Sequence, residues 1–247
     1  MILADEAADV ASIWQLVESC AYGADLAVWS ELTGNASSVL DLGCGIGRVA
    51  RHLAAEGRTV VGVDRDPAMV EDFNRLATES GVVAITGDVT ELGPVDLGHE
   101  RFEAIIAPQQ LLHIVGGHDA RRRLLAGVKD RLEPEGIAAF AISEVVPGES
   151  QTIEILPDLR EVGDSVYASR PVAVEFDEDS LTVIRLRQVV DSEGTLEETH
   201  DRITLDLMDR DSLTAELAAA GLKTEEMIEV PETDRHIASV ILTAGHA

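Results

Sequence analysis

The 247-residue sequence predicts an α/β fold, in which a seven-stranded, mostly parallel sheet carries helices on both faces. Three observations support this prediction. Short β-branched runs alternate with helical stretches between residues 38 and 142, a pattern typical of parallel strands joined by helices. A glycine-rich turn, residues 43–47, follows the first of these runs. Beyond residue 150, long runs of alternating polar and apolar residues predict an antiparallel insert with one solvated face.

Local signals define the elements of the first part of the chain. Apolar residues at helical spacing predict a helix over 8–33 that is interrupted near Gly23. Asp66 before Pro67 is a typical helix start, and the break at 133–136 separates a helix from the strand behind it. The predicted strands are 38–42, 59–64, 82–86, 102–107 and 137–142, and the predicted helices between them are 46–56, 66–79 and 119–132.

The second part of the chain begins with the insert and ends with elements that return to the first sheet. The insert is expected to contain strands 172–176, 181–190 and 196–207, with turns at 177–179 and 191–194. A helix over 211–220 ends at Gly221, and strands over 223–230 and 236–243 follow it. The antiparallel insert therefore comes before the last helix and a final β-hairpin.

Composition restricts the partners of this chain. Its 46 acidic residues against 19 lysines and arginines give a formal net charge of −27, which is spread along the whole sequence. A uniformly acidic surface repels phosphate backbones, so we expect no nucleic-acid partner. Hydrophobic residues make up 45% of the chain but aromatic residues only 3%, so the core must be mainly aliphatic.

Cysteine usage and hydropathy add further expectations. Cys20 and Cys44 are too few for a disulfide framework, and no Cys/His spacing resembles a zinc site, so we expect no metal. Residues 1–6 lack the basic and apolar regions of a signal peptide. The longest apolar run, about 136–142, is far too short to cross a membrane. These features predict a cytoplasmic protein without a membrane partner.

The glycine-rich turn carries the most specific chemical signal. Glycine at alternate positions lets the backbone turn sharply and approach a ligand, and the helix behind the turn offers free N–H groups. Asp41 precedes three glycines, Gly43, Gly45 and Gly47. The dinucleotide fingerprint would need glycine where this chain has Arg48, which disfavours the alternative of an NAD-dependent oxidoreductase.

With Asp41 two residues ahead of it, this turn resembles the first motif of the class I S-adenosylmethionine (SAM) methyltransferases. The resemblance implies a Rossmann-like fold, SAM as cofactor and S-adenosylhomocysteine as product. It assigns the methionine part of SAM to Asp41, Gly43, Cys44, Gly45 and Gly47. Asp64 ends the second strand, 21 residues after Gly43, where a carboxylate can accept both ribose hydroxyls. The remaining implied contacts are Arg65, Met69, Asp88, Val89, Pro108 and Gln109.

Methyl transfer from SAM needs mainly alignment of the two reactants, and a general base only when the acceptor arrives protonated. His113 after the fourth strand and His236 before the last strand are the candidate bases. Tyr22 is a third candidate, placed to cover the cofactor. For both histidines an ordinary structural role is the competing interpretation.

A closer resemblance concerns the run 22–32 before the first motif, the β-rich insert and the late segment 235–240. These are similar to bacterial small-molecule methyltransferases that act on glycine, sarcosine or amino sugars. The resemblance implies a small-molecule acceptor in specialised metabolism, with nitrogen or oxygen as the acceptor atom and carbon as an open alternative. A SAM-binding regulator or pseudoenzyme without transfer activity is the alternative outside enzymes.

We therefore expect four segments in the chain. Residues 1–36 form a helical lid, 37–149 the SAM-binding core, 150–207 the antiparallel insert, and 208–247 the helix and strands that complete the core. The insert is expected to serve as a substrate cap or as a dimer contact, so a homodimer is one of two open alternatives.

Overall fold

The computed structural model describes residues 9–20, 22–233 and 236–247. The chain divides into two compact units. Unit 1 consists of Met1–Ala21 and Val146–Leu207, and unit 2 of Tyr22–Val145 and Met208–Ala247. The division therefore falls at Tyr22, inside the segment 1–36 that we expected to act as one lid.

Unit 2 contains the predicted seven-stranded sheet, in the order β11-β12-β5-β4-β1-β2-β3. Its strands are β1 (Ser38–Leu42), β2 (Thr59–Asp64), β3 (Val82–Thr86), β4 (Phe102–Ala107), β5 (Leu132–Ile142), β11 (Leu222–Val230) and β12 (Ser239–His246). The pairs among β1 to β5 are parallel, whereas β12 runs antiparallel to both β5 and β11. The prediction of a mostly parallel sheet with a final hairpin is confirmed.

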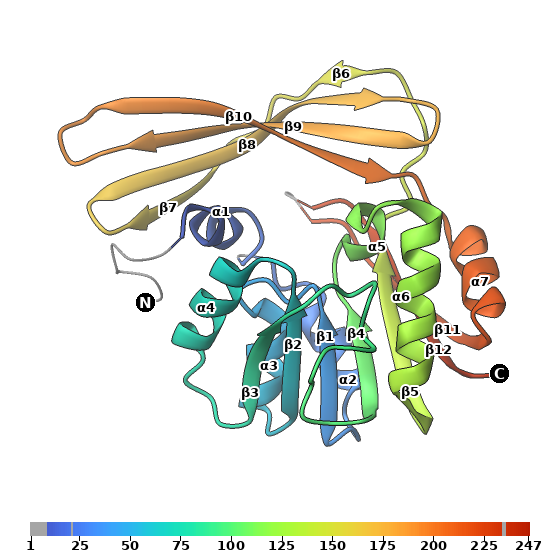
Figure 1. Cartoon of the computed structure of the whole chain (residues 1–247). Coiled ribbons are helices and arrows are strands. Elements are labelled where there is room, and N and C mark those ends of the chain that lie inside the picture. Colours follow the sequence, from blue (N-terminus) through green and yellow to red (C-terminus); the bar gives the residue numbers. More distant parts are fainter. Residues whose placement is uncertain (1–8, 21, 234–235) are drawn as a thin grey trace. The chain divides into compact units, whose positions relative to one another are not determined.

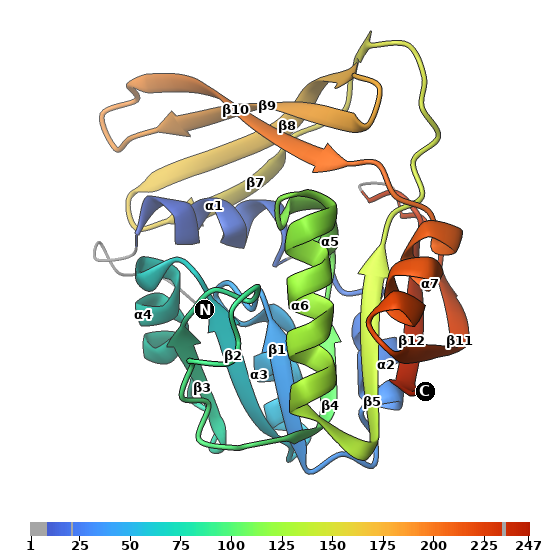
Figure 2. The ribbon, with the colours of Figure 1, turned by 45° about the vertical axis from the view of Figure 1, so that its right-hand side comes forward.

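Helices cover both faces of this sheet (Figure 1, Figure 2). One face packs against helices α6 (Gly117–Arg131) and α7 (Arg210–Ala219), with the short helix α5 (Leu111–Ile114) beside them. The other face packs against α2 (Leu26–Leu32), α3 (Arg48–Ala55) and α4 (Pro67–Leu76). Each face has its own core of buried aliphatic side chains, as the low aromatic content requires.

Two boundaries in unit 2 show how local signals act. Asp66 caps α4 by accepting the N–H of Ala68 at 3.0 Å, and Pro67 is the first helical residue, as predicted. Strand β5 begins at Leu132 and not at 137, because the expected break at 133–136 is absorbed as a register shift. A shift of this kind tolerates proline, which cannot donate to the sheet ladder.

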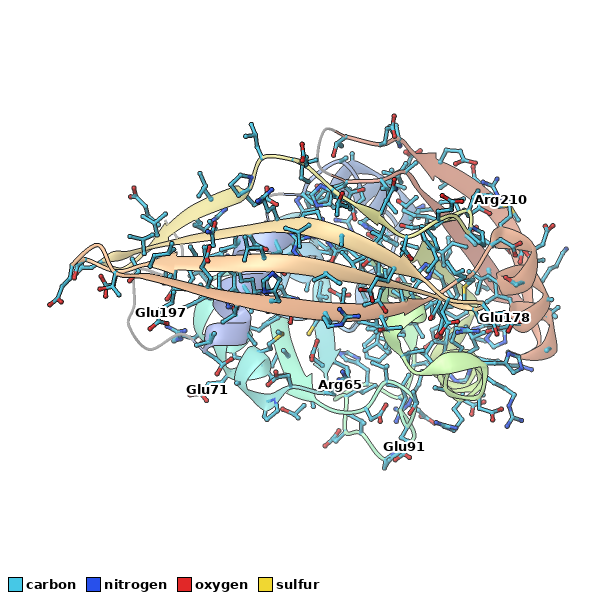
Figure 3. All side chains as sticks on the ribbon, turned by 90° about the horizontal axis from the view of Figure 1, so that it is seen from above. Arg65, Glu71, Glu91, Glu178, Glu197 and Arg210 are labelled. Carbon is cyan, nitrogen blue, oxygen red and sulfur yellow. The ribbon has the colours of Figure 1, made fainter. Side chains whose placement is uncertain are left out.

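Unit 1 contains an antiparallel sheet in the order β10-β9-β8-β6, with β7 paired to β8. Its strands are β6 (Gln151–Thr152), β7 (Asp158–Val162), β8 (Ser165–Phe176), β9 (Ser180–Val190) and β10 (Leu196–Asp206). The antiparallel insert is confirmed, although β6 and β7 were not predicted and β8 starts earlier than expected. Glu178 and Glu197 mark opposite ends of its long strands in Figure 3.

Helix α1 (Val10–Glu18) belongs to unit 1 because ion pairs and rings join it to the insert. The Glu18 carboxylate accepts hydrogen bonds from Arg187 at 2.8 and 2.9 Å and from Ser169 at 2.7 Å. Burial raises the pKa of Glu18, but the bonds from Arg187 and Ser169 outweigh it and hold this pKa below its ordinary value. Trp14 stacks edge-on against Tyr167, with ring centroids 5.4 Å apart.

Candidate functional site

The glycine turn lies at the carboxyl ends of β1 and β2. Gly43, Gly45 and Gly47 have φ angles of 65°, 51° and 87°, a left-handed conformation that other residues rarely adopt. The N–H groups of Gly43 and Cys44 both donate to the carbonyl of Val63, at 2.8 and 3.1 Å. The turn is therefore fixed to the end of β2, and its shape depends on glycine at all three alternating positions.

Asp64 stands at the rim of this turn. Its two carboxylate oxygens accept the backbone N–H groups of Gly45 at 2.9 Å and of Asp66 at 3.0 Å. A carboxylate offers about four acceptor positions, so each oxygen keeps one for an outside donor. The arrangement fits two neighbouring hydroxyls, the feature that the ribose of SAM presents.

Asp41 at the end of β1 is 1% exposed, and its Oδ1 atom has no hydrogen-bond partner. Burial raises the pKa of its carboxyl to about 7, against the attraction of Arg48 and a hydrogen bond from the backbone of Ala50. The nearby carboxylates of Asp64 and Asp25 raise it further. A buried acceptor without a donor is costly, so this atom fits a ligand that brings N–H donors and positive charge, as the methionine part of SAM does.

Arg48, the first residue of α3, is held by a fork of hydrogen bonds to Asp25, at 2.6 and 2.8 Å. The same carboxylate accepts the indole N–H of Trp29 at 2.8 Å, and Arg48 also donates to the carbonyl of Tyr22 at 3.1 Å. Our sequence reasoning missed this pair. The available signal was the arginine itself, because a cation at a helix N-terminus is unfavourable and calls for an anionic partner.

Two predicted residues from distant parts of the chain meet beside Arg48. The ring of His236 lies 4.4 Å from that of Tyr22, tilted by 32°, and the guanidinium of Arg48 lies 5.2 Å from the Tyr22 centroid. Burial, followed by the charge of Asp25, raises the pKa of Tyr22 above its ordinary value. The structure thus groups Tyr22 with His236. Arg235, the first residue of the similar segment 235–240, lies outside the described residues.

His113 lies on the short helix α5, after β4. Its ring is 4% exposed, and its Nε2 atom accepts the backbone N–H of Ser143 at 3.1 Å. The lone pair of Nε2 is engaged in this bond, so the bond favours a structural role for His113. In that role the ring joins the segment after β4 to the end of β5. The role of His113 as a base stays a prediction.

Four of the remaining predicted contacts come after β2 and β3. Arg65 is exposed at the end of β2 (Figure 3), and Met69 is half-buried in α4. Asp88 is exposed and accepts the N–H of Thr90 at 2.8 Å, and the bonds from Thr90 lower its pKa. Val89 beside it is buried. Arg65 and Met69 thus belong to the segment after β2, and Asp88 and Val89 to the segment after β3.

Pro108 and Gln109 follow β4, and both are partly buried. Gln109 has φ 55°, and it is the one non-glycine residue in the described ranges with a positive φ. Strain of this kind is concentrated at ligand sites. The positive φ of Gln109 therefore agrees with its predicted contact with a ligand.

Within residues 9–20, 22–233 and 236–247, no group of three or more acidic, His or Cys side chains is placed to hold a metal ion. In the same ranges, no helix is both long enough and apolar enough to span a membrane.

Comparison with known proteins is consistent with this geometry. Residues 39–136, which include β1 to β4 and the glycine turn, match the family model of a methyltransferase domain. A ubiquinone biosynthesis O-methyltransferase from Methylobacterium nodulans is 34% identical over 94 residues, which is 38% of this chain and 37% of that protein. The chain spans between 30% and 51% of the length of the curated relatives it matches.

Solved structures match almost the whole chain. DesVI of Streptomyces venezuelae superposes with a TM-score of 0.72 at 19% identity, covering 97% of this chain and 98% of DesVI. The sugar N-methyltransferase KedS8 from Streptoalloteichus superposes with a TM-score of 0.71 at 19% identity, covering 100% of this chain and 96% of KedS8. At these identities, the two structures are evidence for the fold alone.

Proposed function

We propose that this chain, whose residues 39–136 match the family model of a methyltransferase domain, is a class I SAM-dependent methyltransferase that transfers a methyl group from SAM to a small molecule. One observation carries the proposal: two carboxylates with free acceptor positions, Asp41 and Asp64, flank a turn of three left-handed glycines. Neighbouring hydroxyls and an ammonium group are the donors that such a pair would accept.

When bound, SAM supplies a methyl group on a positively charged sulfur. In this proposal Asp64 accepts the ribose hydroxyls, Asp41 accepts the ammonium group, and the glycine turn allows the backbone to approach. Positioning of this kind is worth about 7–11 kcal/mol in a reaction between two bound molecules. Tyr22 and His236 are our candidates for contact with the acceptor, because they form one ring pair beside Arg48.

For the methyl acceptor we propose a chemical class and not one compound. A relative named for O-methylation and a structural neighbour named for sugar N-methylation support nitrogen or oxygen of a small molecule, with carbon still open. A role in specialised metabolism, a cytoplasmic location, a homodimer and the substrate-cap role of 150–207 stay predictions.

Calorimetry with SAM, S-adenosylhomocysteine and NAD tests the cofactor. We expect both sulfur compounds to bind and NAD to fail. Asp64→Ala should weaken SAM binding by about 2 kcal/mol, because two hydrogen bonds to a charged acceptor are lost. Asp96→Ala, on the exposed loop after β3, is the matched control and should bind SAM like the unmodified protein. Binding of NAD in place of SAM would overturn the proposal.

Turnover separates the enzyme from a SAM-binding regulator. Incubation with methyl-labelled SAM and a panel of amines, amino sugars and phenols should give a labelled product detected by mass spectrometry. Tight SAM binding without any labelled product across the panel would favour the regulator.

A further inference from the structure

The buried charges around the glycine turn do not balance. Three carboxyl groups, those of Asp25, Asp41 and Asp64, lie there. The charges of Asp25 and Asp64 act on Asp41, and Arg48 is the guanidinium that acts on it. They come from the start of α2, the ends of β1 and β2, and the start of α3. Cys44 adds no charge, because burial, followed by Asp41 and Asp64, raises the pKa of its thiol well above the ordinary value. The charge balance of this cluster therefore favours a ligand that carries a positive charge.

Arg48 is fixed within this cluster. Its fork to Asp25 is buried on both sides, with side-chain exposures of 9% and 4%. The additional bond to the Tyr22 carbonyl holds the same guanidinium from the segment before α2. A planar guanidinium gripped by a carboxylate fork has little freedom to move away.

The position of Arg48 matters most for Asp41. Desolvation favours the neutral form of the Asp41 carboxyl, and the attraction of Arg48 is the largest influence that favours the charged form. The Ala50 hydrogen bond adds to it, whereas Asp64 and Asp25 act in the opposite direction. Asp41 has a free, buried Oδ1 atom, and it attracts a cation as a charged acceptor when the carboxyl is ionised.

We propose that Arg48, held by Asp25, is a positioning residue that keeps Asp41 ionised so that its Oδ1 atom can accept the ammonium group of SAM. The inference rests on the proposed function, because it assumes that SAM is the ligand. It assigns to the arginine after the glycine turn an electrostatic task in cofactor binding, carried out through Asp41 and without contact to SAM.

This role has a signature in the pH dependence of SAM affinity. Protonation of Asp41 at low pH removes the negative charge that attracts the ammonium group, so affinity should fall by up to about tenfold per pH unit below the Asp41 pKa. Removal of the Arg48 charge should move this fall to higher pH. Removal of the Asp25 charge should move it to lower pH, because Asp25 acts on Asp41 in the opposite sense. A purely structural pair would not produce opposite shifts.

The test is the dissociation constant of SAM by calorimetry from pH 5.5 to 8.5. For Arg48→Met, the ratio of its dissociation constant to that of the unmodified protein should be about tenfold near pH 6 and should fall toward one as the pH rises to 8.5. The ligand's own amino group titrates near pH 8, and it cancels in this ratio. Arg48→Lys keeps the charge and should restore most of the affinity at pH 7.

A matched control is Arg58→Met. Arg58 also ties α2 to its surroundings, through the carbonyls of Ser30 and Thr33, but it is not among the groups that act on Asp41. Its ratio should stay near one at every pH. If Arg48→Met does not fold, Asp25→Asn provides the test, because it should move the fall in SAM affinity to lower pH.

The outcomes are distinguishable. A ratio for Arg48→Met that is constant with pH, or equal shifts in both variants, would overturn this inference and leave the proposed function intact. No binding of SAM to the unmodified protein at any pH would overturn the proposed function instead.

Discussion

Asp41 should make the ligand-free protein less stable as the pH rises, and Asp41→Asn should remove this dependence. The folded carboxyl has a pKa of about 7, raised by burial from an ordinary value of 3.8. The folded state therefore holds the proton more tightly than the unfolded state. Between these two values the unfolded protein is ionised while the folded one is not, so the free energy of unfolding falls with rising pH.

The size of this effect follows from the two pKa values. One pKa unit corresponds to about 1.4 kcal/mol, so the shift of Asp41 predicts a loss of about 4 kcal/mol between pH 4 and pH 7. Above pH 7 the loss is complete and the curve is level. Asparagine keeps the shape and an acceptor for Ala50, and its unpaired amide N–H group adds a cost of about 1–3 kcal/mol that does not vary with pH.

Urea unfolding between pH 4.5 and 8.5 measures the difference between the two proteins. The chain has two tryptophans, Trp14 in unit 1 and Trp29 in unit 2, so a Trp14→Phe background lets fluorescence report unit 2 alone. Other titrating groups cancel in the difference. We expect the stability of Asp41→Asn relative to its parent to rise with pH by several kcal/mol and to level off near pH 7.

A contrasting variant is Asp88→Asn, because hydrogen bonds from Thr90 lower the pKa of Asp88. Its carboxylate contributes stability that is present above about pH 4 and is lost as the pH falls below that value. Its difference curve should therefore be level from pH 5 upward. Parallel unfolding curves for Asp41→Asn and its parent would refute the reasoning about the buried carboxyl.

Two further predictions concern packing and unit 1. Gly62→Ala would place a Cβ atom 2.6 Å from the Cys44 sulfur and 2.8 Å from the Cys44 Cβ atom, so we expect a loss of about 1–3 kcal/mol in urea unfolding. Adding Cys44→Ala should relieve this loss only in part, because alanine keeps the Cβ contact, and full stability of the single variant would contradict the close packing. Glu18→Gln removes the charge that Arg187 faces, so we expect the free energy of unfolding of unit 1 to fall by about 2 kcal/mol. Amide hydrogen exchange over 10–18 should become faster. Unchanged exchange would show that the ion pair does not hold α1.

The sheet of unit 2 was predictable because its signals are local. Each strand from β1 to β4 is a short β-branched or aliphatic run, and the start of α4 is set by Asp66 and Pro67. The extension of β5 back to Leu132 was not predictable, since it depends on pairing with Phe102 across an irregular register. Strand β7 is a similar case, because it exists through its pairing with β8.

The glycine turn was predictable for the same reason, since the conformations of Gly43, Gly45 and Gly47 follow from glycine chemistry within five residues. The partner of Arg48 was not, because Asp25 lies 23 residues earlier and joins it only in the folded chain. The sequence therefore identifies the atoms that face a ligand better than it identifies the groups that set their charge.

His113 and His236 show why residue type alone does not identify a base. Histidine as a residue type can act as an acid or a base, and both were candidates on that ground. The ring of His113 is buried with its Nε2 atom bonded to the Ser143 backbone, whereas the ring of His236 lies against Tyr22, beside Arg48. A group that exchanges a proton with an acceptor needs a nitrogen that the acceptor can reach. The surroundings of the two rings therefore favour the Tyr22–His236 pair over His113 as the place to look for contact with the acceptor.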